Sequence, residues 1–225
     1  MDGILLFNKP ILWTSHDAVD FIRRCLGQKT VGHAGTLDPL ATGLLVVLAG
    51  SATKLSSSFM NLDKDYRGTM MLGFSTETQD LEGRVLKSAD YEKVSRADVE
   101  NVFKQFLGKQ RQTPPRFSAV RKNGRKLYDW SRRGIAVTPD AREIVVSRLD
   151  FLCFDPPEVH FFLSCSKGTY VRSLCEEAGE RLGCGAVLSS LARTRVGEFY
   201  LKNAFSEAEL KNLRPSEIDQ RLIRK

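Results

Sequence analysis

Residues 32–43 read GHAGTLDPLATG and lead directly into an apolar run from Leu44 to Ala49. The glycines at 32, 35 and 43 allow positive φ angles and a close approach to a ligand, and Pro39 biases Asp38 toward an extended conformation. An aspartate is ionised at neutral pH, so Asp38 can attack a carbon centre without a metal or a base to activate it. The stretch therefore predicts a shaped loop that holds one nucleophilic carboxylate.

A second interpretation gives Asp38 a purely structural role. Aspartate is a common helix N-cap and proline is common at the first helical position, so Asp38 and Pro39 also fit the start of a helix. Local spacing favours the N-cap over the nucleophile. The choice between the two therefore depends on other segments of the chain.

The stretch at 32–43 resembles the catalytic signature of the TruB family, the bacterial synthases that convert uridine 55 in the T arm of tRNA to pseudouridine. Other segments similar to that family occur in the expected order along nearly the whole chain. They are NKP at 8–10, DKDYR at 63–67, TPP at 113–115 with Ser118-Ala119, GTYVR at 168–172 and LARTRVG at 191–197. The resemblance implies an isomerase, a tRNA pseudouridine synthase that needs no cofactor.

The resemblance assigns catalytic roles to three residues. Asp38 matches the family's nucleophilic aspartate, Arg172 matches the arginine that pairs with it, and Tyr66 matches the tyrosine that lies against the target base. A guanidinium suits the second role because it can hold a carboxylate by two parallel hydrogen bonds. The structural alternatives are a surface arginine near a helix start and a half-buried strand tyrosine.

Four further matches imply contacts with the substrate or support for the site. His33 matches the histidine that fills the space left by the flipped uridine, Tyr170 a second pocket tyrosine, and Leu191 an apolar residue on the target base. Lys9 matches a motif that supports the floor of the active site. The alternatives are a loop histidine bonded to its own backbone, helix-start packing for Tyr170 and an ordinary core leucine.

The charge balance fits a polyanionic partner. The chain has 34 Lys and Arg against 27 Asp and Glu, a net charge of +7, and neutralising phosphates releases counterions. For RNA contacts we look to a basic segment that prolines and a glycine interrupt and that suits a loop along phosphates. Its basic residues are Arg111, Arg116, Arg121, Lys122, Arg125 and Lys126. The alternative is a solvated charged loop.

Composition excludes several classes of protein. With 42% hydrophobic residues, the 225-residue chain can bury one sizeable core or two modest ones. The longest apolar run, 44–49, is far shorter than the roughly 18 residues of a spanning helix, and the N-terminus has no basic signal-peptide region. Five cysteines without a C-x-x-C pair, and histidines without metal spacing, argue against disulfides and zinc. We expect a cytoplasmic monomer with no metal and no membrane contact.

Strand and helix patterns do not alternate regularly, so we expect an α+β fold with a mixed, mostly antiparallel central sheet flanked by helices. The patterns predict strands at 3–7, 66–74, 144–151, 159–165 and 194–201, and helices at 15–26, 95–107 and 170–182. Ser15 is the predicted cap of the first helix. Ser95 with Asp98 predicts a capping box at the start of the second, and Ser206 with Glu209 predicts a capping box that opens a C-terminal helix.

The resemblance implies the pseudouridine synthase fold, with a catalytic domain over 1–200 and a short helical tail over 201–225. Members of the family usually carry a further small RNA-binding domain of the PUA type, for which we expect no room here. We therefore expect contacts confined to the T arm of the tRNA.

Three classes of function compete. The first is a stand-alone tRNA pseudouridine synthase that flips uridine 55 and attacks it with Asp38. The second is a catalytically silent RNA-binding or RNA-folding protein, and a synthase for another RNA uridine also stays open. The third is a glycoside or nucleoside hydrolase, but such enzymes usually need two carboxylates in a fixed pair, which Asp63 or Asp65 would complete only by accident.

Overall fold

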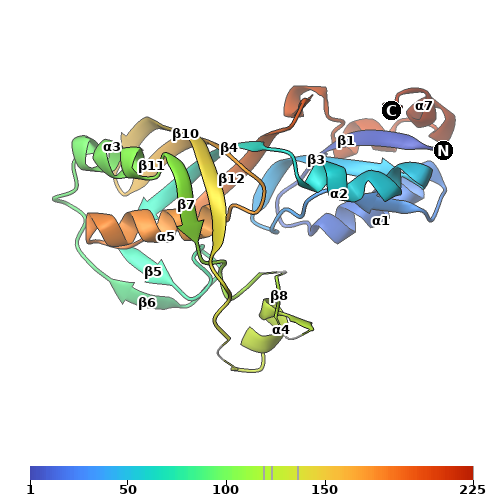
Figure 1. The fold of residues 1–225 in the computed structure, drawn as a ribbon. Helices are drawn as coiled ribbons and strands as arrows, with labels where there is room; N and C mark the ends of the chain where they lie inside the picture. Colours follow the sequence, from blue (N-terminus) through green and yellow to red (C-terminus); the bar gives the residue numbers. More distant parts are fainter. Residues whose placement is uncertain (119, 123, 136, 225) are drawn as a thin grey trace. The chain divides into compact units, whose positions relative to one another are not determined.

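The computed structural model describes residues 1–118, 120–122, 124–135 and 137–224, with only the backbone of Lys126 and Ser131. Ala119, part of one motif named above, lies outside the described residues. The chain forms two compact units, one of Met1–Arg67 with Leu191–Lys225 and one of Gly68–Ser190. Figure 1 shows the course of the chain through both. Each unit is described by itself.

The sheet of the first unit is built around one buried strand, β3. Its strands are β1 (Gly3–Lys9), β2 (Val31–His33), β3 (Ala41–Ala49), the second half of β12 (Ala186–Val196) and β13 (Phe199–Tyr200). β3 pairs antiparallel with β1 and β2 and parallel with β12. Every residue of β3 from Gly43 to Ala49 is buried. Both faces of the strand are covered, which explains the continuous apolar run.

Short helices close the two faces of this sheet. They are α1 (Ser15–Leu26), η1 (Gly50–Leu55), α2 (Ser56–Met60), η2 (Leu201–Asn203), α6 (Glu207–Lys211) and α7 (Pro215–Gln220). Phe21 and Ile22 of α1 lie in a core cluster on one face, which includes Leu210 of α6 and Ile218 of α7. Phe59 of α2 lies in the cluster on the other face.

Helices and strands do not alternate regularly in the second unit, which is typical of an α+β fold. Its elements are the second part of β4 (Lys64–Leu72), from Gly68 on, β5 (Phe74–Thr76), β6 (Val85–Ser88), α3 (Arg96–Gln105), β7 (Gly108–Gln112), β8 (Arg121–Lys122), β9 (Arg125–Lys126), α4 (Leu127–Ser131), β10 (Arg142–Asp155), β11 (Glu158–Cys165), α5 (Val171–Leu182) and the first half of β12. The strand order is β12-β4-β11-β10-β7. Helix α3 packs on β10 and α5 (Figure 1), with Phe103 edge-on to Phe161 at 6.2 Å. The predicted fold class is confirmed.

Two predicted strands are interrupted at glycines. The stretch 66–74 divides into β4 and β5 because Gly73 has a φ of 102°, and 194–201 divides into β12 and β13 at Gly197, with a φ of 55°. These are left-handed conformations that glycine adopts without a steric penalty. The expected capping boxes at Ser95 and Ser206 are both present.

The cap of α1 is a correction. Thr14, not Ser15, has the extended backbone of an N-cap, and its hydroxyl accepts the Asp17 N–H at 3.0 Å while the Asp17 carboxylate accepts the Thr14 N–H. Ser15 is the first helical residue. Its hydroxyl is therefore available for a tertiary contact, described below.

No helix in the described part of the chain is long and apolar enough to cross a membrane. Residues 201–225 contain η2, α6 and α7, and the predicted division at residue 200 stays a prediction.

Candidate active site

Asp38 lies in the loop between β2 and β3 and does not begin a helix. Its carbonyl accepts the N–H of Ala41 at 3.0 Å in a turn that leads into β3, and its side chain is half-buried. The helix-cap interpretation is therefore wrong. Gly35 and Gly43 have the expected positive φ angles, 105° and 97°, whereas Gly32 lies in β2 and does not.

Arg193 of β12 holds the start of this loop. Its side chain is 1% exposed, and it donates from Nε to the carbonyl of Leu44 at 2.8 Å, from Nη2 to Gly35 at 3.0 Å and from Nη1 to Thr36 at 3.5 Å. The parallel pairing of β3 and β12 places Arg193 opposite Gly43. A Cβ at Gly43 would lie 2.4 Å from the Arg193 carbonyl oxygen, so this approach requires glycine.

Ser15 holds the middle of the loop. Its hydroxyl accepts the N–H of Leu37 at 2.8 Å and donates to the Leu37 carbonyl at 3.1 Å, and the Leu37 side chain is buried. The bonds from Arg193, the bond from Ser15 and the Asp38–Ala41 turn together hold the carbonyls of four consecutive residues, 35–38. The sequence did not indicate the contacts of Ser15 and Arg193 with this loop, because nothing local marks a side chain that bonds a distant backbone.

Lys9 holds the end of the loop. It is fully buried at the end of β1, and its Nζ donates to the carbonyls of Pro10 at 2.9 Å, Trp13 at 2.5 Å and Pro39 at 3.5 Å. Burial lowers the pKa of Lys9 to about 8, an effect that the negative charge of Asp38 opposes. This geometry agrees with the supporting role inferred for Lys9, which stays a prediction.

Tyr66 and Leu191 are in the same unit as Asp38. Tyr66 is buried in β4, and the half-buried Leu191 starts the segment of β12 that pairs with β3. Asp65, next to Tyr66, is held by Arg195 through two parallel bonds, 2.6 Å from Nε and 2.7 Å from Nη2. This pair raises the pKa of Arg195 and commits the Asp65 carboxylate to a structural contact. The hydrolase alternative thereby loses one of its candidate second carboxylates.

His33 is the last residue of β2. Burial lowers the pKa of its imidazole, and the charges of Arg193 and His16 lower it further, so the ring is neutral at neutral pH. Within the described chain its buried Nδ1 has no hydrogen-bond partner, which argues against a histidine bonded to its own loop through that atom. A neutral, flat ring suits the stacking role inferred for it.

Arg172 is in the second unit, in the first turn of α5. It is 6% exposed, which rules out the surface-arginine alternative. Its guanidinium donates to the carbonyls of Thr78 at 3.0 Å and Phe117 at 3.1 Å, and lies 3.5 Å from the carboxylate of Asp80. The inferred pairing of Arg172 with Asp38 stays a prediction.

Asp80 is a buried charge that sequence analysis missed. It is 4% exposed, its carbonyl accepts the Thr76 hydroxyl at 2.6 Å, and its carboxylate accepts the Thr78 hydroxyl and the Glu82 N–H. The local signal is only a threonine-aspartate turn pattern, which many loops share. The loop therefore presents an ordered carboxylate to Arg172.

Tyr170 is the N-cap residue of α5. Its N–H donates to Oε1 of Gln112 at 2.7 Å, and Nε2 of Gln112 donates back to the Tyr170 carbonyl at 3.0 Å. The Arg142 guanidinium lies 5.3 Å from the centre of the half-buried Tyr170 ring. The backbone at Tyr170 is thus fixed by β7, and the ring has a cationic neighbour.

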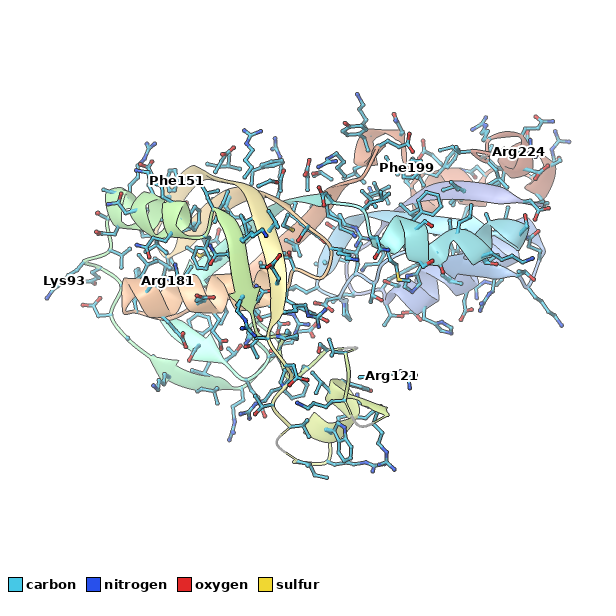
Figure 2. All side chains as sticks on the ribbon, in the orientation of Figure 1. Lys93, Arg121, Phe151, Arg181, Phe199 and Arg224 are labelled. Carbon is cyan, nitrogen blue, oxygen red and sulfur yellow. The ribbon has the colours of Figure 1, made fainter. Side chains whose placement is uncertain are left out.

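Part of the basic segment is a folded hairpin, which corrects the expected loop there, and Arg111 lies in strand β7. Arg121 and Lys122 of β8 pair with β9, which begins at Arg125, and α4 follows. Arg121 (labelled in Figure 2) and Arg125 are exposed, and the guanidinium of Arg125 lies 5.4 Å from the centre of the Trp130 ring. Lys122 donates to Asp140 at 3.0 Å. Arg116, before the hairpin, is exposed.

No group of three or more His, Cys, Asp or Glu side chains within the described residues could hold a metal ion. The arrangement offers instead a carboxylate on a clamped loop in one unit and a buried arginine with exposed basic side chains in the other.

Two models of known protein families match the chain. The family model of the TruB family pseudouridylate synthase N-terminal domain matches residues 23–171, and that of the tRNA pseudouridylate synthase B C-terminal domain matches residues 172–225. The chain belongs to the TruB family. The Asp38 loop lies within the residues that the N-terminal family model matches.

Relatives of this TruB family member are similar along most of its length. It is 44% identical over 223 residues to the tRNA pseudouridine synthase B of Opitutus terrae, covering 99% of this chain and 92% of that one. It is 46% identical to the protein of the same name from Geobacter sulfurreducens, covering 95% and 70%. Among solved structures, a chain of a Cbf5-Nop10-Gar1 complex matches with a TM-score of 0.70 and 28% identity over 91% of this chain and 52% of that chain.

In this TruB family chain, Arg193→Met should lower the free energy of unfolding by about 3 kcal/mol, since buried carbonyls of Leu44 and Gly35 lose their donor. Urea denaturation measures the loss. Arg214→Met, which removes an arginine whose side chain is 79% exposed in the same unit, should change stability by less than about 0.5 kcal/mol. Equal effects for the two variants would contradict the inference that the bonds of Arg193 stabilise the fold.

The buried Lys9 predicts a pH dependence of stability. Its pKa is about 8 in the folded chain against an ordinary 10.5, so between these values the unfolded chain binds more protons and stability rises with pH. The rise amounts to at most about 3 kcal/mol. We expect wild type to gain on Lys9→Met as pH increases through this window, measured by urea denaturation at several pH values. A stability difference between wild type and Lys9→Met that stays constant with pH would contradict the lowered pKa of Lys9.

Proposed function

We propose that this TruB family member isomerises uridine 55 in the T arm of tRNA to pseudouridine, with Asp38 as its nucleophile. The observation that carries the proposal is the Asp38 loop, in which Arg193, Ser15 and Lys9 hold successive backbone carbonyls. A carboxylate that must attack one carbon gains rate when it is held in one position before the substrate arrives. The family membership supplies the reaction.

The reaction breaks the bond between ribose C1′ and N1 of uracil, turns the base and rejoins it through C5. The Asp38 carboxylate forms or steers the covalent intermediate, and no electron leaves or enters. Tyr66 contacts the detached base, and Arg172 orients the Asp38 carboxylate. Both assignments rest on the family motif and on the burial of each side chain.

The target uridine has to leave its stack before Asp38 can reach C1′. His33 stacks in the vacated space, in agreement with its neutral ring, while Leu191 and Tyr170 contact the flipped base. The exposed Arg116, Arg121 and Arg125, with Lys122, bind RNA phosphates. The protein acts in the cytoplasm as a monomer and contacts the T arm. A catalytic domain over 1–200 followed by a helical tail completes the proposal.

The experiment is incubation of the purified protein with an unmodified T-arm stem-loop carrying 5-tritiated uridine, without any other RNA. Isomerisation exchanges the C5 hydrogen, so the proposal predicts release of one tritium per target uridine. A stem-loop with cytidine at the target position is the matched control and should release none. Binding without release would indicate another RNA target or an RNA-binding role.

A further inference from the structure

The turn between β1 and α1 presents two apolar side chains to solvent. Ile11 is 55% exposed and Leu12 is 75% exposed. Leu12 also has a φ of 68°, and among the described residues Gln79 is the one other non-glycine with a positive φ. A leucine in the left-handed region is strained, because its Cβ crowds the backbone. Since the Leu12 side chain is so exposed, packing within the fold does little to offset this strain.

Bonds on both sides of Leu12 impose its conformation. Its N–H donates to the carbonyl of Pro39 at 2.9 Å. Lys9 bonds the carbonyls of Pro10 and Trp13, the residues that flank the exposed pair, and reaches Pro39 as well. Trp13 lies edge-on to Phe21 of α1 at 5.5 Å. The turn is therefore rigid and is tied to the residue that follows Asp38.

We propose that Ile11 and Leu12 form an apolar tip that packs against an RNA base next to the target uridine, an inference that rests on the proposed function. Leu12 is bonded to Pro39, so RNA with its target ribose at Asp38 lies beside this turn. Extrusion of one nucleotide leaves a neighbouring base face without its stacking partner, and apolar side chains cover such faces well. Strained residues persist at functional sites where their surroundings determine them, as here.

The Leu12→Gly variant distinguishes the backbone strain at Leu12 from the contact that its side chain makes with RNA. Glycine removes the side chain and adopts the left-handed backbone without strain, so we expect the Tm to rise by about 2–4 °C. We expect kcat/KM for tritium release to fall roughly tenfold, mainly through KM, because an apolar contact with RNA is lost. Leu12→Ala, which keeps the strain, should lose the same activity without the gain in Tm.

Leu86→Ala is the matched control, because Leu86 of β6 is 54% exposed and lies in the second unit. It should leave kcat/KM unchanged. RNA affinity, measured by fluorescence anisotropy in an Asp38→Asn background, gives a second readout. The ratio of wild-type to Leu12→Gly affinity should be the same at about 50 and about 200 mM salt, since an apolar contact releases no counterions.

Several results would contradict the proposal that the apolar tip packs against an RNA base. One is a Leu12→Gly variant that is more stable and fully active, and another is one that is less stable than wild type. Conversion of a dimer to a monomer by Leu12→Gly in sedimentation velocity would show that the tip covers a second copy of the chain. A wild-type protein that releases no tritium contradicts the proposed function instead. The ratio of wild-type to Leu12→Gly affinity for RNA then tests whether the apolar tip contacts RNA.

Discussion

Asp38→Asn should reduce tritium release at least about a thousandfold while leaving the affinity for the stem-loop within about twofold of wild type. The amide has nearly the shape of the carboxylate but cannot attack C1′. The bonds from Arg193, Ser15 and Lys9 to this loop go to backbone carbonyls of residues 35–37 and 39, so the variant should keep the loop conformation. Single-turnover tritium release and fluorescence anisotropy measure the two quantities.

The position of Asp38 before Pro39 helps this test. The proline nitrogen carries no hydrogen, so the usual cyclisation that converts asparagine back to aspartate is blocked, and residual activity would belong to the variant itself. Asp90→Asn, which changes an exposed aspartate of the second unit, is the matched control and should be fully active. A variant at position 38 that retained more than a few per cent of the rate would place the nucleophile elsewhere.

The second large effect is expected at Arg172. Arg172→Met should lower the free energy of unfolding by about 3–5 kcal/mol, because it leaves the buried Asp80 carboxylate without its cation. The carbonyls of Thr78 and Phe117 lose their donors as well. Arg96→Met removes an arginine from the exposed pair with Glu100, and its effect should be within about 1 kcal/mol. Urea denaturation of the two variants makes the comparison.

A double variant distinguishes the structural role of Arg172 from its role in the reaction. In Arg172→Met with Asp80→Asn the buried uncompensated charge is gone, so at least about 1 kcal/mol of the lost stability should return. If Arg172 also orients Asp38, as proposed, tritium release by the double variant should stay at least about a hundredfold below wild type. Recovery of activity together with stability would assign Arg172 to the fold alone.

Much of the fold follows from local patterns. The capping boxes at Ser95 and Ser206 are bonds between a side chain and a backbone three residues away, so neighbouring residues suffice to predict them. The first helix has its predicted bounds, but its N-cap is Thr14 and not Ser15, because both are good N-cap residues and only the backbone conformation distinguishes them. The breaks at Gly73 and Gly197 depend on the conformation that each glycine takes, since glycine is also tolerated within strands.

Part of the candidate site is likewise predictable from local sequence, and part of it depends on residues that are distant in the chain. The motif at 32–43 contains its nucleophile and its glycines within twelve neighbouring residues, so it can be found without a structure. The side chains that hold the motif are distant in the chain. Ser15 is 22 residues from Leu37, and Arg193 is 149 residues from Leu44. The role of Asp80, likewise, depends on its contact with Arg172, which lies on a different element.

The amino-acid sequence by itself determined the fold class, the family and the position of the candidate nucleophile, because these depend on residue types at short and regular spacings. The tertiary structure alone decided which buried groups clamp the Asp38 loop, that Arg172 meets Asp80, and that Leu12 is strained and exposed. The physical reason is that a hydrogen bond or an ion pair depends on distances of a few ångströms in space, and separation along the chain does not determine these distances.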